Sequence, residues 1–461
     1  MMKNKLHYTL LIISALFIVS SGISYLAGII SATGLLLIAG FIALAVGVRG
    51  FEKLKGYSYT LWIFTAVTAS MFYPQFFISV GDFQLKKLIV PLLQIIMFGM
   101  GSQMSFKDFS GVIKMPKGVF VGVFSHYMIM PLVGFGIARI FNFPPEIAAG
   151  IILIGCVPSG LASNVMSFLA RANLALAVTV GAISTLLSPF VTPLLMKWLG
   201  GQYIEVNFWS MMLDILNMII LPIVAGFIFN LFSKGKEKLK SKIIQLVSYM
   251  VIILLTNLVY MKSKDAGFSG FLIQFTKSMG WFFFLPMIGA MVLSHFLKGE
   301  NKYMEKVLSL VSMVGIAVIV TIITASGRDS LLKVGALLMV TSLIHNLTGY
   351  TLGYWLSWLV GMPEKDRRTI AFEVGMQNGG LASGLALQMG KVATVGLAPA
   401  IFGPLMNVTG SVLANYWRGK PVKGEEEVKS QKSKVRRALS SLPWRGEGWF
   451  KSKSEVKSNK L

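Results

Sequence analysis

The chain has 461 residues, of which 54% are hydrophobic and only 13% are charged. Apolar runs of about 20 residues recur along it, the length that crosses a bilayer core, so we predict an all-α polytopic membrane protein and exclude a soluble globule and a β-barrel. The formal net charge of +24 does not indicate nucleic-acid binding, because the Lys and Arg residues fall in short loops and in the C-terminal tail.

Hydrophobic segments are predicted along nearly the whole sequence. In chain order they cover about 6–30, 32–48, 57–79, 88–104, 118–140, 147–170, 173–199, 208–232, 242–262, 272–298, 305–325, 332–360, 369–390 and 393–417. With the N-terminus in the cytoplasm, most basic loops and the basic tail share one side, so the positive-inside rule predicts that both termini are cytoplasmic. The tail at 419–461 has little apolar pattern and is predicted to be disordered, with contact to anionic lipid heads as the alternative.

Two of these segments are interrupted by helix-breaking residues near their middle. Segment 147–170 meets Pro158, Ser159 and Gly160, and segment 369–390 is interrupted by the string GMQNGGLASG. Proline removes a backbone donor, and glycine accepts the torsion angles of an unwound stretch. The string GLAS occurs at both interruptions, and paired interruptions in two halves of a membrane protein point to a transporter site.

The interrupted helices also provide groups that can bind an anion and a cation. Unwound backbone survives in lipid only where protein or a watery cavity receives it. Half-helix N-termini that meet near the midplane favour an anion, whereas side-chain oxygens and free carbonyls suit a hard cation. A carboxylate at mid-membrane costs about 2.5–3.5 kcal/mol or more unless it is paired or hydrated, which favours a functional role for Glu373. We therefore expect one site for an anionic solute and a coupling ion.

The interruptions lie in the longer strings GCVPSGLASNVMSFLARANLALAV and RRTIAFEVGMQNGGLASGLAL. These strings resemble the two signature crossover helices of the bile acid:sodium symporter family, with further similarity in IIMFGMGSQMSFKDF, HYMIMP, LIHNLTGY and MNVTGSVLANYW. The resemblance implies two inverted five-helix repeats that form a panel and a core domain and move an organic anion with sodium.

Compared with that ten-helix plan, this chain has about four additional transmembrane helices. The predicted organisation is 1–56, extra N-terminal transmembrane helices; 57–240, first repeat and start of the second; 241–303, an inserted transmembrane hairpin; 304–418, the remainder of the second repeat with its crossover helix; and 419–461, a basic cytoplasmic tail. Peripheral helices without a part in transport are the preferred interpretation of the additions, and docking of a partner is the alternative.

The resemblance also implies two sodium sites. The first takes Ser163, Asn164 and Glu373, together with two hydroxyl residues of the next helix, whose positions here hold Ala177 and Gly181. The loss of two hydroxyl oxygens is expected to weaken that site. The second site takes the following groups: the side chains of Glu373 and Gln377, the backbone carbonyls of Val374 and Met376, and a glutamine that is replaced here by His126.

His126 leaves the coupling ion open between two interpretations. An imidazole is a soft ligand for sodium and can carry a proton near neutral pH. In one interpretation His126 and Glu373 form a proton-coupled replacement for one sodium site. In the other, which we prefer, His126 hydrogen-bonds a backbone carbonyl while one sodium ion still binds. A second histidine, His345, is expected to hydrogen-bond between helices.

We predict a secondary active transporter that couples sodium to symport of an organic anion, a carboxylate or a bile-acid-like molecule, by alternating access. Proton-coupled transport of an organic anion is the alternative. The residues expected to contact the solute are Gly160, Asn378, Gly380 and Asn407. The sequence does not distinguish between small monocarboxylates and larger amphipathic anions as the solute.

Other functional classes fit the sequence poorly. An intramembrane zinc protease would need a His-Glu-x-x-His pair, which is absent, and a channel would need a pore-lining filter rather than two broken helices. The expected partners are the lipid bilayer and a small organic anion, without nucleic acid, and the sequence is compatible with a monomer. The expected location is a bacterial inner (cytoplasmic) membrane.

Overall fold

The computed structural model describes residues 2–51, 54–104, 111–234 and 301–420, and these are almost wholly helical. The helices are α1 (Met2–Leu26), α2 (Ile30–Gly47), α3 (Ser58–Phe72), α4 (Gln75–Ile78), α5 (Ile89–Gly101), α7 (Gly111–Lys114), α8 (Pro116–Ile140), α9 (Pro145–Cys156), α10 (Ala162–Leu169), α11 (Leu174–Leu199), α12 (Phe208–Ile215), α13 (Leu221–Lys234), α17 (Asn301–Ser326), α18 (Arg328–Leu359), α19 (Glu364–Gly375), α20 (Gly379–Gln388) and α21 (Leu397–Arg418). The minor elements are η1 (Val48–Gly50), η2 (Lys55–Tyr57), η3 (Leu85–Leu88), η4 (Gly200–Gln202), the π-helical η5 (Leu216–Ile220), and the paired strands β1 (Ser79–Val80) and β2 (Phe83–Gln84).

The described part confirms an all-α polytopic membrane protein. Seven helical stretches are long and apolar enough to cross a membrane: Lys5–Leu26, Ile30–Gly50, Pro116–Ile140, Leu174–Gln202, Phe208–Phe227, Arg328–Leu359 and Leu397–Arg418. The predicted interruptions are confirmed too, because segment 147–170 divides into α9 and α10 and segment 369–390 divides into α19 and α20. The predicted segments 242–262 and 272–298 and nearly all of the basic tail lie outside the described residues.

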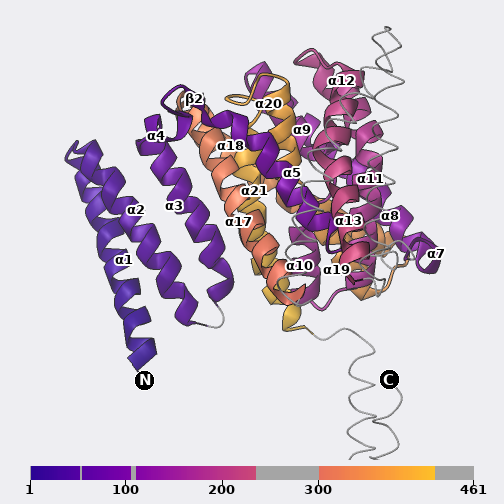
Figure 1. Cartoon of the computed structure of the whole chain (residues 1–461), viewed down its shortest axis with the longest axis horizontal. Helices are drawn as coiled ribbons and strands as arrows, with labels where there is room; N and C mark the ends of the chain where they lie inside the picture. Colours follow the sequence, from indigo (N-terminus) through magenta and orange to yellow (C-terminus); the bar gives the residue numbers. More distant parts are fainter. Residues whose placement is uncertain (1, 52–53, 105–110, 235–300, 421–461) are drawn as a thin grey trace, which may run out of the picture.

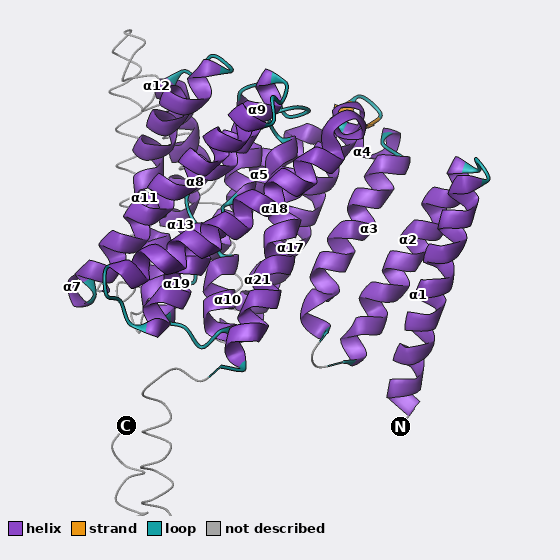
Figure 2. Ribbon diagram, turned by 180° about the vertical axis from the view of Figure 1, so that it is seen from behind, coloured by secondary structure: helices purple, strands orange, loops and turns teal. Residues whose placement is uncertain are grey.

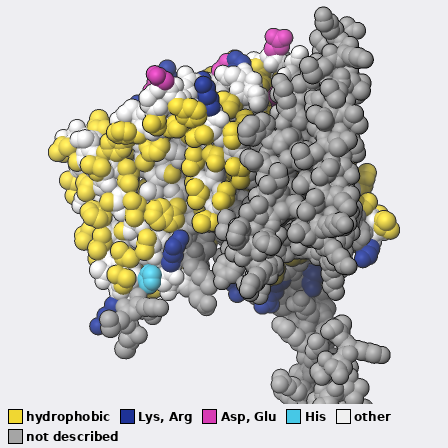
Figure 3. All heavy atoms as spheres, viewed as in Figure 1, with side chains coloured by type: hydrophobic (Ala, Val, Ile, Leu, Met, Phe, Trp, Pro, Cys, Tyr) yellow, Lys and Arg dark blue, Asp and Glu magenta, His cyan; other side chains and the backbone are white. Residues whose placement is uncertain are grey.

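The N-terminal pair of helices lies at one edge of the molecule. α1 packs on α2, and α2 packs on α3, so that α3 separates the pair from the other helices (Figure 1). Hydrogen bonds join the pair internally and to α3, from Ser21 Oγ to Thr33 O at 2.9 Å and from Ser58 Oγ to Ala45 O at 2.8 Å. Figure 3 shows hydrophobic side chains spread over this face, as expected of a surface that contacts lipid.

The remaining helices form two groups that meet at the interrupted helices. In the first group α5 packs between α13 and α17, and α17 also packs on α3. Glycine allows a close approach of α5 and α13, because a Cβ on Gly101 would lie 2.0 Å from Ile223 O. The second group contains α8, α9, α10, α11, α18, α19 and α21, which pack on one another (Figure 2). α20 contacts both groups, through α5 and through α21.

The first halves of the interrupted helices lie deep in the second group. Every residue of α9 from Ile147 onward is buried, and so is every residue of α19 from Arg368 onward. Because both stretches are buried on all sides, the C-terminal end of each of the two helices lies inside protein. The unwound backbone that follows each of them is therefore kept away from lipid.

Candidate ion and solute site at the helix crossing

The two unwound segments cross and pair through their backbones. An isolated antiparallel bridge joins Ser159 to Gln377. Its hydrogen bonds run from Gly160 N to Met376 O at 3.0 Å and from Asn378 N to Pro158 O at 2.9 Å. Around this bridge, α10 contacts α19 and α20 contacts α9, so each half-helix meets the opposite half of the other interrupted helix.

Local sequence explains why the chain unwinds at these positions. Pro158 has no N–H to donate to the preceding turn of α9. Gly160 passes so close to the second segment that a Cβ at its position would lie 2.6 Å from Gln377 O, a separation that no larger residue tolerates. Asn378 then starts α20, because its side chain accepts a hydrogen bond from Leu381 N at 3.0 Å.

His126 lies at the crossing, between the C-terminal ends of α9 and α19. Its Nδ1 is 2.8 Å from Glu373 O and its Nε2 is 2.8 Å from Val157 O, and the side chain is fully buried. The prediction that His126 hydrogen-bonds a backbone carbonyl is thus confirmed, and the structure adds a second carbonyl. His345 also contacts another helix as predicted, with Nε2 2.8 Å from Met130 O.

The next three carbonyls of α19 and its break already accept hydrogen bonds from protein donors. The pairs are Gln377 Nε2 to Val374 O at 2.7 Å, Asn346 Nδ2 to Gly375 O at 2.8 Å, and Gly160 N to Met376 O at 3.0 Å. Asn346 in turn accepts from Thr409 Oγ1 at 2.5 Å. The supporting roles of Thr409 and Asn346 were not anticipated, because nothing in the sequence shows which carbonyl a helical amide will reach.

Several oxygens near the crossing have no such partner. Both carboxylate oxygens of Glu373, Oε1 of Gln377 and Oδ1 of Asn164 are buried without a hydrogen bond within the described residues. The hydroxyls of Ser159 and Ser163 lie near the carboxyl group of Glu373 without forming a well-aligned hydrogen bond to it, and Ser163 Oγ donates to Gly160 O at 2.8 Å instead. Uncompensated buried oxygens are costly, and a hard cation such as sodium would satisfy them.

Gly181 faces this group of oxygens from α11. A Cβ at its position would lie 3.5 Å from Glu373 Oε2, which is an ordinary contact distance. Gly181 O already accepts from Ser184 Oγ at 3.0 Å and from Thr185 Oγ1 at 2.7 Å. Ala177 is fully buried one turn earlier on the same helix. The two positions thus offer no side-chain oxygen beside the carboxylate.

Serine hydroxyls provide further buried polar groups that the sequence reasoning did not single out. Ser125 precedes His126 on α8, and Ser167 follows the break on α10; both Oγ atoms are buried without a hydrogen-bond partner within the described residues. The available signal was a serine in a helix, either adjacent to a predicted site residue, as Ser125 is to His126, or one turn beyond one, as Ser167 is beyond Ser163.

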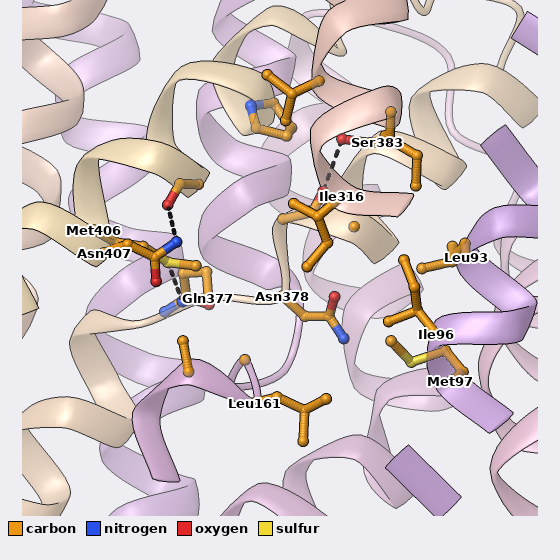
Figure 4. Close-up of a pocket in the computed structure, with 18 residues that line it drawn as sticks. Leu93, Ile96, Met97, Leu161, Ile316, Gln377, Asn378, Ser383, Met406 and Asn407 are labelled. Atoms are coloured by element: carbon orange, nitrogen blue, oxygen red, sulfur yellow. Dashed lines mark hydrogen bonds between the residues drawn. The ribbon is translucent and has the colours of Figure 1, made fainter. Parts of the chain in front are cut away.

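A cavity opens on the other side of the crossing, between the two groups of helices. It encloses about 730 Å³, part of it open to solvent, and its walls come from α5, α17, α20, α21 and both unwound segments. All four residues predicted to contact the solute line it: Gly160, Asn378, Gly380 and Asn407. Figure 4 shows the Asn378 side chain pointing into this space, toward Leu161 and the apolar wall that contains Ile96 and Met97.

The cavity is polar at the crossing and apolar opposite it. Its polar side chains are those of Gln377, Asn378, Ser383 and Asn407, and no Lys, Arg, Asp or Glu is among the described residues that line it. The first residues of α10 and α20 belong to the lining, so the partial positive charge of two helix N-termini is directed at the cavity. The Oδ1 atom of Asn378 caps α20, which leaves its amide nitrogen to face the cavity.

Comparisons with known proteins agree with this geometry. A model of the sodium bile acid symporter family matches residues 90–267. The chain is 33% identical over 384 residues to the uncharacterized sodium-dependent transporter YocS of Bacillus subtilis (strain 168), an alignment that covers 83% of this chain and 98% of that protein. The chain belongs to the sodium bile acid symporter family.

Other relatives of this symporter are chloroplast proteins of plants. It is 29% identical over 326 residues to the probable sodium/metabolite cotransporter BASS1 of Arabidopsis thaliana, covering 71% of this chain and 65% of that protein. It is 26% identical over 344 residues to the probable sodium/metabolite cotransporter BASS2 of Oryza sativa subsp. japonica, covering 73% and 66%. This member of the family is therefore an integral multi-pass membrane transporter for a small molecule, and not an enzyme.

Proposed function

We propose that this symporter imports an organic anion together with sodium by alternating access across a bacterial inner membrane, with both termini in the cytoplasm. The observation that carries the proposal is the placement of the Glu373 carboxylate, buried without a hydrogen-bond partner, beside a neutral cavity that receives two helix N-termini. A cation and an anion can then bind a few residues apart on one pair of broken helices.

Sodium would bind on the carboxylate side of the crossing. The proposed ligands are the side-chain oxygens of Ser163, Asn164, Glu373 and Gln377, three of which have buried oxygens without a protein partner. The carbonyls of Val374 and Met376, which the family resemblance also implies, have only their second lone pair to offer. We therefore assign one sodium ion to the Glu373 side chain.

The anion would bind in the cavity on the opposite side. The amide nitrogen of Asn378 and the N-termini of α10 and α20 favour a carboxylate there. The apolar wall formed by residues of α5 and α17 suits a hydrocarbon body attached to that carboxylate. This combination supports a carboxylate as the solute class and accommodates both small monocarboxylates and amphipathic anions.

Charge explains how the two ligands would be coupled. The carboxylate of Glu373 repels an anion held at the same crossing, and in a buried site this repulsion is weakly screened. Sodium beside Glu373 removes the repulsion and so raises the affinity for the anion. The effect is reciprocal, so the anion also raises the affinity for sodium.

Alternating access would use the boundary between the two groups of helices. The cavity lies at this boundary, with α5 and α17 on one side and α21 and the unwound segments on the other. Movement of one group against the other would expose the cavity to each side of the membrane in turn. The inverted-repeat relation and the division into repeats predicted from the sequence belong to this proposal.

Proton coupling through His126 and Glu373 is the second candidate, favoured by the position of both residues at the crossing. The two candidates differ in the gradient that drives uptake into proteoliposomes. Sodium coupling predicts uptake driven by a sodium gradient at constant pH and insensitive to a pH gradient. Uptake that needs a pH gradient and ignores sodium would reject sodium coupling in favour of the proton mechanism.

The solute can be identified by thermal unfolding of the purified full chain. A panel of organic anions is screened in sodium chloride and in potassium chloride, because a ligand that binds only the folded state raises the unfolding temperature. We expect at least one carboxylate to stabilise the protein in sodium and to have little effect in potassium. Equal stabilisation in both salts by every active anion would contradict sodium-coupled symport.

A further inference from the structure

Arg171, which follows the last turn of α10, has an unusual backbone conformation. Its φ is 55°, in the left-handed region that favours glycine. Two backbone hydrogen bonds form a Schellman motif at this helix end. Arg171 N donates to Phe168 O at 3.2 Å, and the next amide, Ala172 N, donates to Ser167 O at 2.9 Å. The motif requires a left-handed residue, so an arginine at this position is strained where a glycine would not be.

The second interrupted helix ends in the same motif, but with a glycine. Gly390, which follows α20, has a φ of 71°, and its N donates to Leu387 O at 2.9 Å. Lys391 N donates to Ala386 O, also at 2.9 Å. The helix ending therefore does not need an arginine. The side chain of Arg171 is exposed and forms no ion pair with an acidic side chain in the described part of the chain.

Two more exposed basic side chains lie close to Arg171, at the end of α21. The buried side chain of Arg368 joins the two helix ends, because its Nη1 donates to Ala170 O at 3.3 Å and to Lys420 O at 3.2 Å. α10 also packs on α21 (Figure 2). We call the three exposed residues at these ends, Arg171, Arg418 and Lys420, the basic cluster.

The acidic side chains at the start of α19, beside the basic cluster, already have partners. Glu364 accepts from Arg368 Nε at 2.8 Å and pairs with Arg367 Nη2 at 3.3 Å. Asp366 Oδ1 accepts from Asn173 Nδ2 at 2.8 Å. The positive charge of the basic cluster is therefore available to an anion from outside the protein.

Aromatic side chains place this end of the molecule at the depth of lipid headgroups. Trp355 and Trp358, near the end of α18, and Tyr416, near the end of α21, are each about half exposed. Both helices are long and apolar enough to cross a membrane, and Trp and Tyr gather at the ends of such helices, where the bilayer meets water. Lys420 Nζ lies 4.2 Å from the centroid of the Tyr416 ring, so the basic cluster is at the same depth.

We propose that the basic cluster binds the headgroup of an anionic phospholipid at the ends of α10 and α21. Arginine and lysine form charge-assisted hydrogen bonds with phosphate oxygens, and basic residues at the membrane surface attract anionic lipids. The strained backbone of Arg171 keeps a cation at a position where the second interrupted helix has glycine. The inference concerns neither the solute nor the coupling ion, so it is independent of the proposed function.

Native mass spectrometry of the full chain tests this site. The chain is released from detergent micelles that contain equal amounts of phosphatidylglycerol and phosphatidylcholine with the same acyl chains. We expect the wild type to retain phosphatidylglycerol in preference. Arg171→Gly removes one charge and suits the left-handed backbone, so it should unfold at the wild-type temperature or higher while the preference falls roughly fivefold. Arg418→Gln combined with Lys420→Gln should lower the preference further.

Lys86→Gln combined with Lys87→Gln is the matched control for that double variant. These exposed residues lie in η3, next to β2 at the opposite end of the molecule, so the preference should persist (Figure 1). No preference in the wild type, the wild-type preference in Arg171→Gly, or an equal loss in the control would overturn the proposal. Displacement of the lipid by inorganic phosphate at constant ionic strength would also overturn it, because the cluster would then recognise a free anion. If the double variant at 418 and 420 does not fold, Arg171→Gly alone decides.

Discussion

Ser159 and Gln377, from opposite halves of the chain, pair as an antiparallel bridge where the two interrupted helices cross. Each unwound segment thereby supplies a backbone partner to the other, through the bonds from Gly160 N to Met376 O and from Asn378 N to Pro158 O. Unpaired peptide groups would be costly in a membrane interior, so this pairing allows both helices to break at the same place. The bridge divides the crossing into a carboxylate side and a cavity side.

Gly160→Ala is expected to disrupt this crossing. The added methyl group would lie 2.6 Å from Gln377 O, and overpacking of this kind costs about 1–3 kcal/mol. Thermal unfolding in detergent should therefore occur at a lower temperature than in the wild type. Gly379→Ala is the matched control, because its Cβ would lie 3.5 Å from the nearest atom, Pro399 O. Equal unfolding temperatures for the two variants would show that the close approach at Gly160 is not required.

Gly181→Ser is expected to strengthen sodium binding. Its Cβ fits 3.5 Å from Glu373 Oε2 and would bring a hydroxyl oxygen to the proposed sodium site. One added ligand worth about 0.5–1.5 kcal/mol corresponds to roughly a twofold to tenfold lower half-saturating sodium concentration. Gly136→Ser, where a Cβ meets nothing within 4 Å, should leave sodium affinity unchanged. A weaker sodium response in Gly181→Ser would place the ion elsewhere.

Asn378→Asp distinguishes the role of Asn378 as the cap of α20 from its proposed role in binding the solute. A carboxylate oxygen can still accept the hydrogen bond from Leu381 N, so the cap of α20 should persist. The amide N–H that faces the cavity is lost and a negative charge takes its place, so we expect at least about a tenfold loss of affinity for an anion. Ser383→Ala, which removes another polar group of the lining, should have a smaller effect. Solute-dependent unfolding measured in sodium chloride checks both expectations, and unchanged anion affinity in Asn378→Asp would exclude Asn378 from the anion site.

Arg368→Ala tests how much the buried side chain of Arg368, in α19, contributes to the stability of the fold. Arg368 is 2% exposed, and its Nη1 donates to Ala170 O at 3.3 Å, Trp417 O at 3.1 Å and Lys420 O at 3.2 Å. Loss of these hydrogen bonds and of the ion pair between Arg368 Nε and Glu364 Oε1 should destabilise the fold by about 2–4 kcal/mol. Arg367→Ala removes a partly exposed ion pair and should cost less than about 1 kcal/mol. Similar unfolding temperatures for both variants would contradict the role of Arg368 as an anchor.

The interruptions could be predicted because their causes are local. Proline and glycine destabilise the interior of a helix in any context, so Pro158 and Gly160 favour a break, and the glycines near Gln377 act in the same way. The four predicted solute contacts line one cavity for a related reason, since residues at two paired breaks of a transporter meet near the membrane centre. By contrast, the π-helical stretch Leu216–Ile220 contains no helix breaker and gave no signal in the sequence.

The partners of individual polar groups could not be predicted from the sequence. The composition of α8 makes His126 conspicuous, but only the packing of α9 and α19 against α8 gives it two carbonyl partners. Likewise, the sequence does not indicate that the carbonyl of Val374 accepts a hydrogen bond from Gln377 Nε2, as it does in the structure. Hydrogen bonds between distant segments depend on tertiary packing, which residue spacing does not encode.

Binding of radioactive sodium to the purified chain tests most directly whether Glu373 holds the coupling ion. The wild type and Asp329→Asn, whose side chain is 92% exposed and far along the sequence from the crossing, are expected to bind sodium saturably and to retain it in excess potassium. Glu373→Gln has nearly the same shape without the charge, and it should unfold at a similar temperature while losing saturable binding. Equal sodium binding by folded Glu373→Gln, or no saturable binding by the folded wild type, would contradict a sodium site at this carboxylate.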